Sequence, residues 1–185
     1  MKVVVLTGPE STGKSSLAAS LHQRFGGLLL GEYVREYIDH EGRDTHYGDI
    51  EPIAREQLAR EDLARAQAPH LLILDTHLLS NKLWSQTLFH DCPPWLEPEL
   101  LSRHYDLHLL LAPEGMPWLA DGQRCQPELA ERQAFYRASE KWLKQHQQVW
   151  LALGGDWAQR QQQAQQAVAA LLASASDACA AAGKR

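Results

Sequence analysis

A short loop near the start of the chain has the composition of a phosphate-binding loop. Residues 8–15 read Gly-Pro-Glu-Ser-Thr-Gly-Lys-Ser and lie between an apolar run and a segment with helical spacing. The glycines permit backbone torsions that a side chain would block, so the loop amides can converge on a phosphate at a helix N-terminus. We expect Lys14 to bridge the β- and γ-phosphates of ATP and Ser15 to hold Mg²⁺ through its hydroxyl. The expected nucleotide-binding residues are Gly8, Pro9, Glu10, Ser11, Thr12, Gly13, Lys14, Ser15 and Ser16.

An aspartate directly follows the apolar run 71–74. Asp75 therefore has the position of a Walker B aspartate, which reaches the magnesium shell, and we assign it catalytic and metal-binding roles. Thr76 comes next, where hydrolytic motor ATPases typically carry a glutamate. This favours phosphoryl transfer to a bound acceptor over hydrolysis. The alternative interpretation of Asp75 is a helix-capping or loop aspartate.

The pair Asn81-Lys82 is superficially similar to the start of the guanine-specificity motif Asn-Lys-x-Asp. Trp84 occupies the place of the required aspartate and cannot pair with guanine. No Asp-x-x-Gly switch follows the run 71–74 either. The sequence therefore argues against a GTPase.

The segment Glu32-Tyr-Val-Arg-Glu-Tyr37 follows the second apolar run, where small-molecule P-loop kinases bind their acceptor. The carboxylate of Glu32 can take the proton of an attacking hydroxyl, with Asp75 as the rival base. Arg35 can brace a phosphate or an acidic neighbour, and the two tyrosines can stack on a ring. The alternative is an ordinary amphipathic helix with surface ion pairs. The residues assigned to the acceptor are Glu32, Tyr33, Arg35, Tyr37, Trp84 and Asp121, of which Trp84 can equally be a packing residue.

The segment Pro117-Trp-Leu-Ala-Asp-Gly-Gln-Arg124 follows the fourth apolar run, and Arg132 lies further along the chain. Kinases keep their lid in this place. Closure of such a lid would bring guanidinium groups onto the transferring phosphoryl group and exclude water. We therefore assign catalytic roles to Lys14, Glu32, Asp75, Arg124 and Arg132. For both arginines the alternative is a surface position.

Short apolar runs alternate with segments of helical spacing along the chain. The expected strands are 3–6, 28–30, 71–74, 106–111 and 149–152. The expected helices are 15–25, 49–66, 78–89, 96–104, 127–146 and 156–173, with a short helix or loop at 32–39. This order predicts an α/β fold of the P-loop NTPase type, a three-layer sandwich around a parallel sheet of about five strands, kinase-like with a lid. Ligands should bind beyond the carboxyl ends of the strands.

Length and composition indicate one ordinary globular domain. The 185 residues are 44% hydrophobic and 22% charged, and we expect a P-loop kinase domain at 1–173 and a frayed, Ala-rich tail at 174–185. The net charge of −5 argues against a nucleic-acid partner. No apolar stretch reaches the length of a membrane span, so we expect no membrane partner and a cytoplasmic location. Neither the three cysteines nor the nine histidines have the spacing of a zinc site.

Taken together, these motifs resemble a known family. The segments 8–15, 32–37, 75–76 and 117–124, in this order and spacing, are similar to the ribosylnicotinamide kinase domain of the NadR proteins. The similarity runs from about residue 2 to residue 170. It implies ATP-dependent phosphorylation of the 5′-hydroxyl of nicotinamide riboside, which gives nicotinamide mononucleotide. The adenylyltransferase and DNA-binding segments of full NadR proteins have no room in this chain, so only the kinase role is carried over.

One position departs from the family pattern. Some members place a tryptophan just before Glu-Tyr, where it stacks on nicotinamide, and here that position is Gly31. Tyr37 or Trp84 would then supply the stacking surface, or the acceptor differs. The alternatives are a kinase for another nucleoside or small alcohol, and a nucleotide-binding regulatory ATPase. The sequence does not indicate an oligomeric state.

Overall fold

The computed structural model describes the backbone of residues 1–182 and the side chains of residues 1–174. Its centre is a parallel sheet with the strand order β2-β3-β1-β4-β5. The strands are β1 (Lys2–Thr7), β2 (Leu28–Leu30), β3 (Leu71–Asp75), β4 (Leu107–Leu111) and β5 (Trp150–Leu153). The three central strands are buried almost throughout, whereas the edge strands β2 and β5 are partly exposed. Continuous apolar runs suit strands that are covered on both faces.

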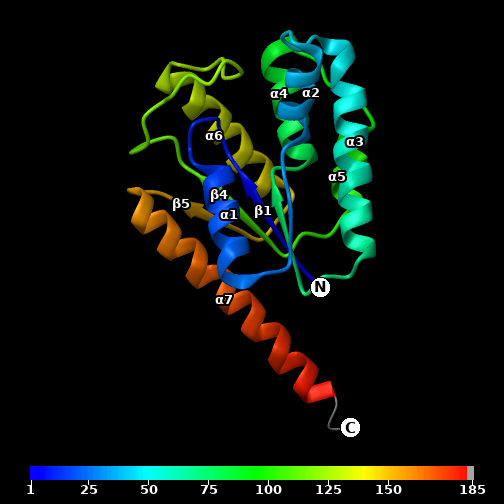
Figure 1. Cartoon of the computed structure of the whole chain (residues 1–185), viewed down its shortest axis with the longest axis vertical. Helices are drawn as coiled ribbons and strands as arrows, with labels where there is room; N and C mark the ends of the chain where they lie inside the picture. Colours follow the sequence, from blue (N-terminus) through cyan, green and yellow to red (C-terminus); the bar gives the residue numbers. More distant parts are fainter. Residues whose placement is uncertain (183–185) are drawn as a thin grey trace.

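Seven helices within residues 1–182 connect and flank the strands (Figure 1). They are α1 (Lys14–Phe25), α2 (Tyr33–Glu41), α3 (Tyr47–Ala66), α4 (Leu78–Phe89), α5 (Leu96–Ser102), α6 (Leu129–Gln145) and α7 (Trp157–Ala182). In Figure 1 the helices α2, α3 and α4 stand together at the upper right, and α7 leaves the body of the molecule to form its lowest part. No described helix is both long and apolar enough to span a membrane.

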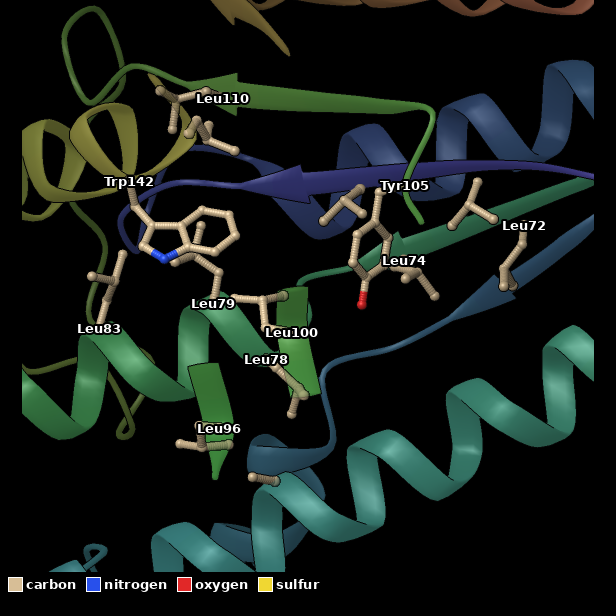
Figure 2. Close-up of a cluster of buried hydrophobic side chains, with 14 of the residues drawn as sticks. Leu72, Leu74, Leu78, Leu79, Leu83, Leu96, Leu100, Tyr105, Leu110 and Trp142 are labelled. Carbon is tan, nitrogen blue, oxygen red and sulfur yellow. The ribbon is translucent and has the colours of Figure 1, made fainter. Parts of the chain in front are cut away.

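Two apolar cores, one on each face of the sheet, hold the helices in place. Alternate residues of one strand enter opposite cores, since side chains along a strand alternate between faces. Val3 and Val5 join the core under α3, α4 and α6, whereas Val4 and Leu6 join the core under α1 and α7. In the first core Trp142 of α6 lies with leucines of α4 and β3 (Figure 2). The arrangement is the three-layer sandwich expected from the alternating pattern.

The registers bring the functional segments to one edge of the sheet. Leu6 of β1 pairs with Asp75 of β3 and with Leu109 of β4. The loops that follow these strands therefore begin side by side. The phosphate-binding loop, Asp75 and the segment 113–128 after β4 meet at the carboxyl edge. This is the ligand-binding edge of open α/β sheets.

The fold class is confirmed, and most expected boundaries lie within about two residues of the observed ones. The segment expected as a short helix or loop at 32–39 is the helix α2. The helix α7 continues to Ala182, past the end expected near residue 173. The division into a domain at 1–173 and a frayed tail at 174–185 stays a prediction, and residues 183–185 lie outside the described residues.

Candidate active site

The phosphate-binding loop has a backbone shape that its glycines make possible. Gly8 has φ 128°, and a Cβ atom there would lie 2.6 Å from the carbonyl oxygen of Leu111. Gly13 caps the N-terminus of α1 in the left-handed conformation, with φ 86°. The Thr12 hydroxyl donates to the carbonyl of Pro9 at 2.9 Å and closes the loop. Side chains are costly in both glycine conformations, so the sequence pattern and the loop geometry agree.

A small cavity of about 70 Å³ lies inside this loop, and we call it the loop cavity. Its lining includes residues 10–16 of the loop, together with Glu32, Arg35 and Arg124. Gly8 and Pro9 shape the loop without lining the cavity. The N-terminus of α1 opens on this space, which suits an anionic group.

Lys14 is half-buried in the loop and binds the loop itself. Its ammonium donates to the carbonyl of Pro9 at 2.7 Å. Burial lowers the pKa of Lys14, while the nearby carboxylates of Glu32 and Asp75 oppose this effect. The ammonium therefore lies among acidic groups at the cavity wall, from which it can turn to a phosphate.

Glu32 occupies the N-cap position of α2, and its side chain lines the loop cavity. Its carboxylate accepts hydrogen bonds from the Thr76 hydroxyl at 3.5 Å and from Arg35 Nε at 3.3 Å. Burial raises the pKa of Glu32, Lys14 lowers it, and Asp75 raises it further. A carboxylate with a raised pKa is a better proton acceptor than an ordinary glutamate, so this group suits general base chemistry.

Asp75 ends β3 at the buried edge of the loop. Its Oδ1 atom is buried and has no hydrogen-bond partner among the described residues. Thr76 follows with φ 71°, an unfavourable conformation for a β-branched residue, and its amide donates to the carbonyl of Leu6 at 3.1 Å. The orphaned oxygen of Asp75 and the hydroxyl of Ser15 are both oxygen ligands of the kind that Mg²⁺ prefers. The described residues hold no cluster of three or more His, Cys, Asp or Glu for a metal ion, so a magnesium ion here would need phosphate oxygens as well.

A second cavity, the large cavity, adjoins the loop cavity and has a volume of about 520 Å³. Helices α2, α3, α4 and the lid segment surround it. Its apolar wall includes Val34, Ile38, Ile50, Ile53, Trp84 and Phe89, and its polar wall includes Asp44, Gln57, Ser80 and Asn81. An apolar pocket with a few polar groups is typical of small-molecule sites.

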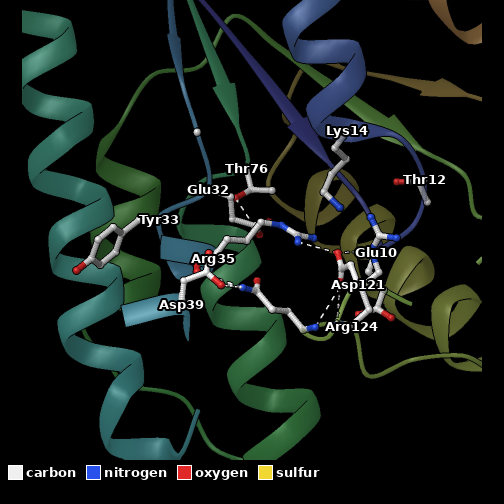
Figure 3. A network of polar contacts seen from close by, with 12 residues as sticks. Glu10, Thr12, Lys14, Glu32, Tyr33, Arg35, Asp39, Thr76, Asp121 and Arg124 are labelled. Carbon is white, nitrogen blue, oxygen red and sulfur yellow. Dashed lines mark hydrogen bonds and ion pairs between the residues drawn. The ribbon is translucent and has the colours of Figure 1, made fainter. Parts of the chain in front are cut away.

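Several charged side chains line both cavities. They are Glu10, Lys14, Glu32, Arg35 and Arg124. A ligand in the large cavity and a phosphate in the loop cavity would therefore share these groups. The shared wall is where the acidic and basic side chains of Figure 3 converge.

The lid segment, residues 113–128, crosses this wall. Arg124 lies on the cavity side, and its guanidinium pairs with Asp121 Oδ2 at 3.0 Å. The other carboxylate oxygen of Asp121 accepts the amides of Gln123 and Arg124 at 3.1 Å and 3.0 Å. Asp121 thus shapes the lid turn and lines neither cavity, whereas we expected it to bind the acceptor.

The two tyrosines of α2 require a correction. Neither Tyr33 nor Tyr37 lines the large cavity. The Tyr33 ring lies under the guanidinium of Arg60 at 4.3 Å, and the Tyr37 hydroxyl donates to Asp49 at 2.7 Å. Residues 34, 35 and 38 of α2 face the cavity. The side chains at positions 33 and 37 lie on another side of the helix and contact α3. The structure therefore places neither ring on the cavity wall, where the expected stacking role would need it.

Arg132 also departs from the expectation. It is buried on α6 and lines neither cavity, so its expected role at the transferring phosphate stays a prediction. Arg124, Arg35 and Trp84 are where the sequence placed them, on the cavity wall. The large cavity also includes Gln57, Ser80 and Asn81, which sequence reasoning missed. The one available signal was Gln57, a polar residue on the same helical face as Ile53.

A buried arginine behind the loop was missed as well. Arg160 of α7 is fully buried. Its guanidinium donates to the carbonyls of Thr12 at 3.4 Å, Ala112 at 2.7 Å and Glu114, and its Nε donates to the carbonyl of Gly155 at 2.9 Å. One side chain thus joins the phosphate-binding loop, the start of the lid segment and the turn before α7.

The fold and this edge of the sheet define a P-loop protein with a kinase-like lid. The sequence matches the family described as AAA domain over residues 3–160, so the chain belongs to that family. The NadR protein of Salmonella typhimurium (strain LT2), a trifunctional NAD biosynthesis/regulator protein, is 28% identical over 150 residues, which are 79% of this chain and 36% of that protein. Its Escherichia coli (strain K12) counterpart is 27% identical over the same shares. The chain thus spans about a third of the length of these relatives. These matches confirm the expected similarity to NadR proteins.

Solved structures show the same fold. The crystal structure of a NadR protein in complex with NR has a TM-score of 0.73 and 20% identity, covering 90% of this chain and 50% of that one. A NadR protein in complex with NAD and AMP-PNP has a TM-score of 0.72. Deoxyadenosine kinase from M. mycoides has a TM-score of 0.59 and 12% identity, covering 91% of this chain and 99% of that one. At these identities the likeness shows the P-loop kinase fold alone.

Proposed function

We propose that the protein is an ATP-dependent kinase that phosphorylates the ribose 5′-hydroxyl of nicotinamide riboside and yields nicotinamide mononucleotide. The observation that carries the proposal is the position of Glu32. It lines the wall between the phosphate-binding loop and the large cavity, next to Lys14. A hydroxyl held in the large cavity would meet a proton acceptor and a phosphate site at one place. The resemblance to NadR proteins, one of them solved with NR, supports nicotinamide riboside as the acceptor.

In this mechanism the acceptor hydroxyl gives its proton to the Glu32 carboxylate as its oxygen bonds to the γ-phosphorus. The bond from that phosphorus to the ADP oxygen then breaks. Lys14 and Arg124 neutralise the charge on the transferring group and the leaving ADP. Ser15 and Asp75 would hold Mg²⁺, which would supply positive charge against the phosphates. The lid excludes water, so that the phosphoryl group passes to the acceptor.

The large cavity also accommodates a second candidate, a kinase for another nucleoside. Gly31 itself carries no ring, and a Cβ atom there would have no neighbour within 4 Å. Trp84 and Phe89 supply aromatic surface on the α4 side instead, and such a surface accepts any flat base.

The test is an ADP-release assay with ATP, Mg²⁺ and a panel of nucleosides that includes nicotinamide riboside. We expect release that depends on nicotinamide riboside, with nicotinamide mononucleotide as the product. Stimulation by a different nucleoside alone would favour the second candidate. Slow release that ignores every acceptor would favour a nucleotide-binding regulatory ATPase and overturn the proposal.

A further inference from the structure

The side chain of Glu10 is bonded to the lid. Glu10 lies within the phosphate-binding loop and is 7% exposed. Its Oε1 accepts the indole N–H of Trp118 at 2.7 Å and the amide of Gln126 at 2.8 Å. Its Oε2 accepts the amide of Cys125 at 3.1 Å. Both ends of the lid turn therefore converge on one carboxylate.

The neighbouring residue of the loop repeats this connection. The hydroxyl of Ser11 accepts the amide of Leu119 at 3.3 Å. The lid is thus bonded to the loop on both sides of its turn, at 118–119 and at 125–126. Hydrogen bonds to a charged acceptor are stronger than neutral ones, so the Glu10 contacts dominate this fastening.

Arg124 lies between these anchor points. The next residue in the chain, Cys125, donates its amide to Glu10, and the Arg124 guanidinium pairs with Asp121 on the opposite side. Arg124 lines both cavities. The carboxylate of Glu10, which belongs to the phosphate-binding loop, therefore fixes the position of Arg124 at the loop cavity.

We infer that Glu10 is a positioning residue, which fastens the lid to the phosphate-binding loop and thereby holds Arg124 over the transferring phosphoryl group. The inference rests on the proposed kinase function. The contact requires two acceptor oxygens: a glutamine keeps one of them and turns an amide group, itself a donor, toward the amide of Cys125. Glu10→Gln therefore removes part of the fastening with almost no change in size.

Two readouts test the inference on Glu10→Gln and on Trp118→Phe, which removes a donor from the lid side. Hydrogen exchange of the peptide containing Cys125 and Gln126 reports on the lid contact and needs no catalysis. The ratio of acceptor phosphorylation to acceptor-independent ATP hydrolysis reports on the positioning of Arg124 and the exclusion of water. Glu131→Gln, which removes an exposed carboxylate at the start of α6, is the matched control.

We expect faster exchange of that peptide in both variants and a ratio lowered about ten-fold or more, with Glu131→Gln like the wild type. Unchanged exchange in both variants would overturn the fastening. Faster exchange with an unchanged ratio would overturn the positioning of Arg124. If the wild type phosphorylates no nucleoside, the proposed function fails, and the exchange result alone still decides whether Glu10 holds the lid. If Glu10→Gln does not fold, the exchange and the ratio measured for Trp118→Phe decide the inference.

Discussion

The guanidinium of Arg35 binds the carboxylate of Asp121 at 2.9 Å and joins helix α2 to the lid. Gln123 adds to this junction, since its amide group donates to Asp39 Oδ1 at 2.6 Å and to the carbonyl of Arg35 at 3.3 Å. The lid is therefore bonded to the wall of the large cavity as well as to the phosphate-binding loop. A ligand that enters the large cavity meets a boundary made of both.

This junction predicts a coupled effect on the acceptor. We expect Arg35→Met and Asp121→Asn each to lower kcat/KM for the acceptor about ten-fold. The double variant should lose little more, because all three variants break the same Arg35–Asp121 ion pair. The measurement is a double-mutant cycle on kcat/KM. Glu36→Gln breaks an exposed pair with Arg60 and serves as the control, with less than a two- to three-fold effect expected. Fully additive losses at positions 35 and 121 would contradict the coupling.

Lys14 is predicted to act on the transition state. We expect Lys14→Met to lower kcat about 10²- to 10³-fold, because the charge on the transferring phosphoryl group loses its ammonium partner. Steady-state kinetics at saturating ATP and acceptor measure the loss. Lys141→Met, at an exposed position of α6, should leave kcat unchanged. Equal kcat values for the two variants would remove Lys14 from the mechanism.

The raised pKa of Glu32 predicts how the activity falls at acidic pH. The base works only when it is ionised, and the pKa of Glu32 is raised by burial. Activity should therefore fall as the pH drops through this raised pKa, earlier than an ordinary glutamate would require. We expect Glu32→Gln to lower kcat about 10²- to 10⁴-fold and to abolish this acid limb. A Glu32→Gln enzyme that keeps both the rate and the limb would move the role of base to Asp75.

Substitutions of Trp84 and Tyr37 should differ in their effect on KM for the nucleoside. Trp84 lines the large cavity and packs on Phe135, with ring centroids 4.8 Å apart. We expect Trp84→Ala to raise KM for the nucleoside about ten-fold or more and to leave KM for ATP unchanged, since a base loses its stacking surface. Tyr37→Phe should change neither constant, because its ring faces α3. An effect of Tyr37→Phe on nucleoside KM that exceeds that of Trp84→Ala would contradict this placement.

The helix-loop junction after α2 predicts a pH-dependent stability. The Arg43 guanidinium binds Asp49 at 2.7 Å and, with the hydroxyl of Tyr37, holds the pKa of this buried carboxyl far below its ordinary value. A lowered pKa stabilises the folded state at pH values above the ordinary aspartate pKa of about 4, and the contribution is lost as the pH falls below it. We expect Asp49→Asn to lower the free energy of unfolding by about 2 kcal/mol at pH 7.

Urea unfolding of the wild type and of Asp49→Asn at several pH values checks this expectation. The difference between the two proteins should shrink below pH 4. Asp44→Asn, an exposed aspartate in the same loop, is the control and should shift the free energy of unfolding by less than about 0.5 kcal/mol. A constant difference down to pH 2 would show that the charge of Asp49 is not responsible.

The sequence predicts the parts of this protein that local rules control. Gly8, Gly13 and the apolar run before them define one loop geometry, and the alternation of runs defines a parallel sheet. Asp75 ends β3 and Glu32 lies two residues after β2, so their place at the carboxyl edge follows from the topology. Arg124 and Trp84 were found for a similar reason, because each lies on an element that returns to this edge.

The remaining site residues depend on helix rotation and on side-chain direction. Spacing alone does not reveal which face of α2 meets the cavity, and the tyrosines at 33 and 37 turned out to face α3. Arg132 is buried on α6 and lines neither cavity, which its spacing in the sequence does not reveal. The bonds from Glu10 to the lid join residues more than a hundred positions apart, and no periodic pattern records such a contact.

The four carbonyls around Arg160 have an electrostatic consequence. An arginine keeps its charge at any physiological pH, and this one is fully buried, with no carboxylate bonded to it among the side chains that the structure describes. Bulk salt screens such a charge poorly. We expect this fixed charge behind the phosphate-binding loop to attract an anion toward the loop cavity. This attraction should survive at ionic strengths that weaken the exposed ion pairs of the surface.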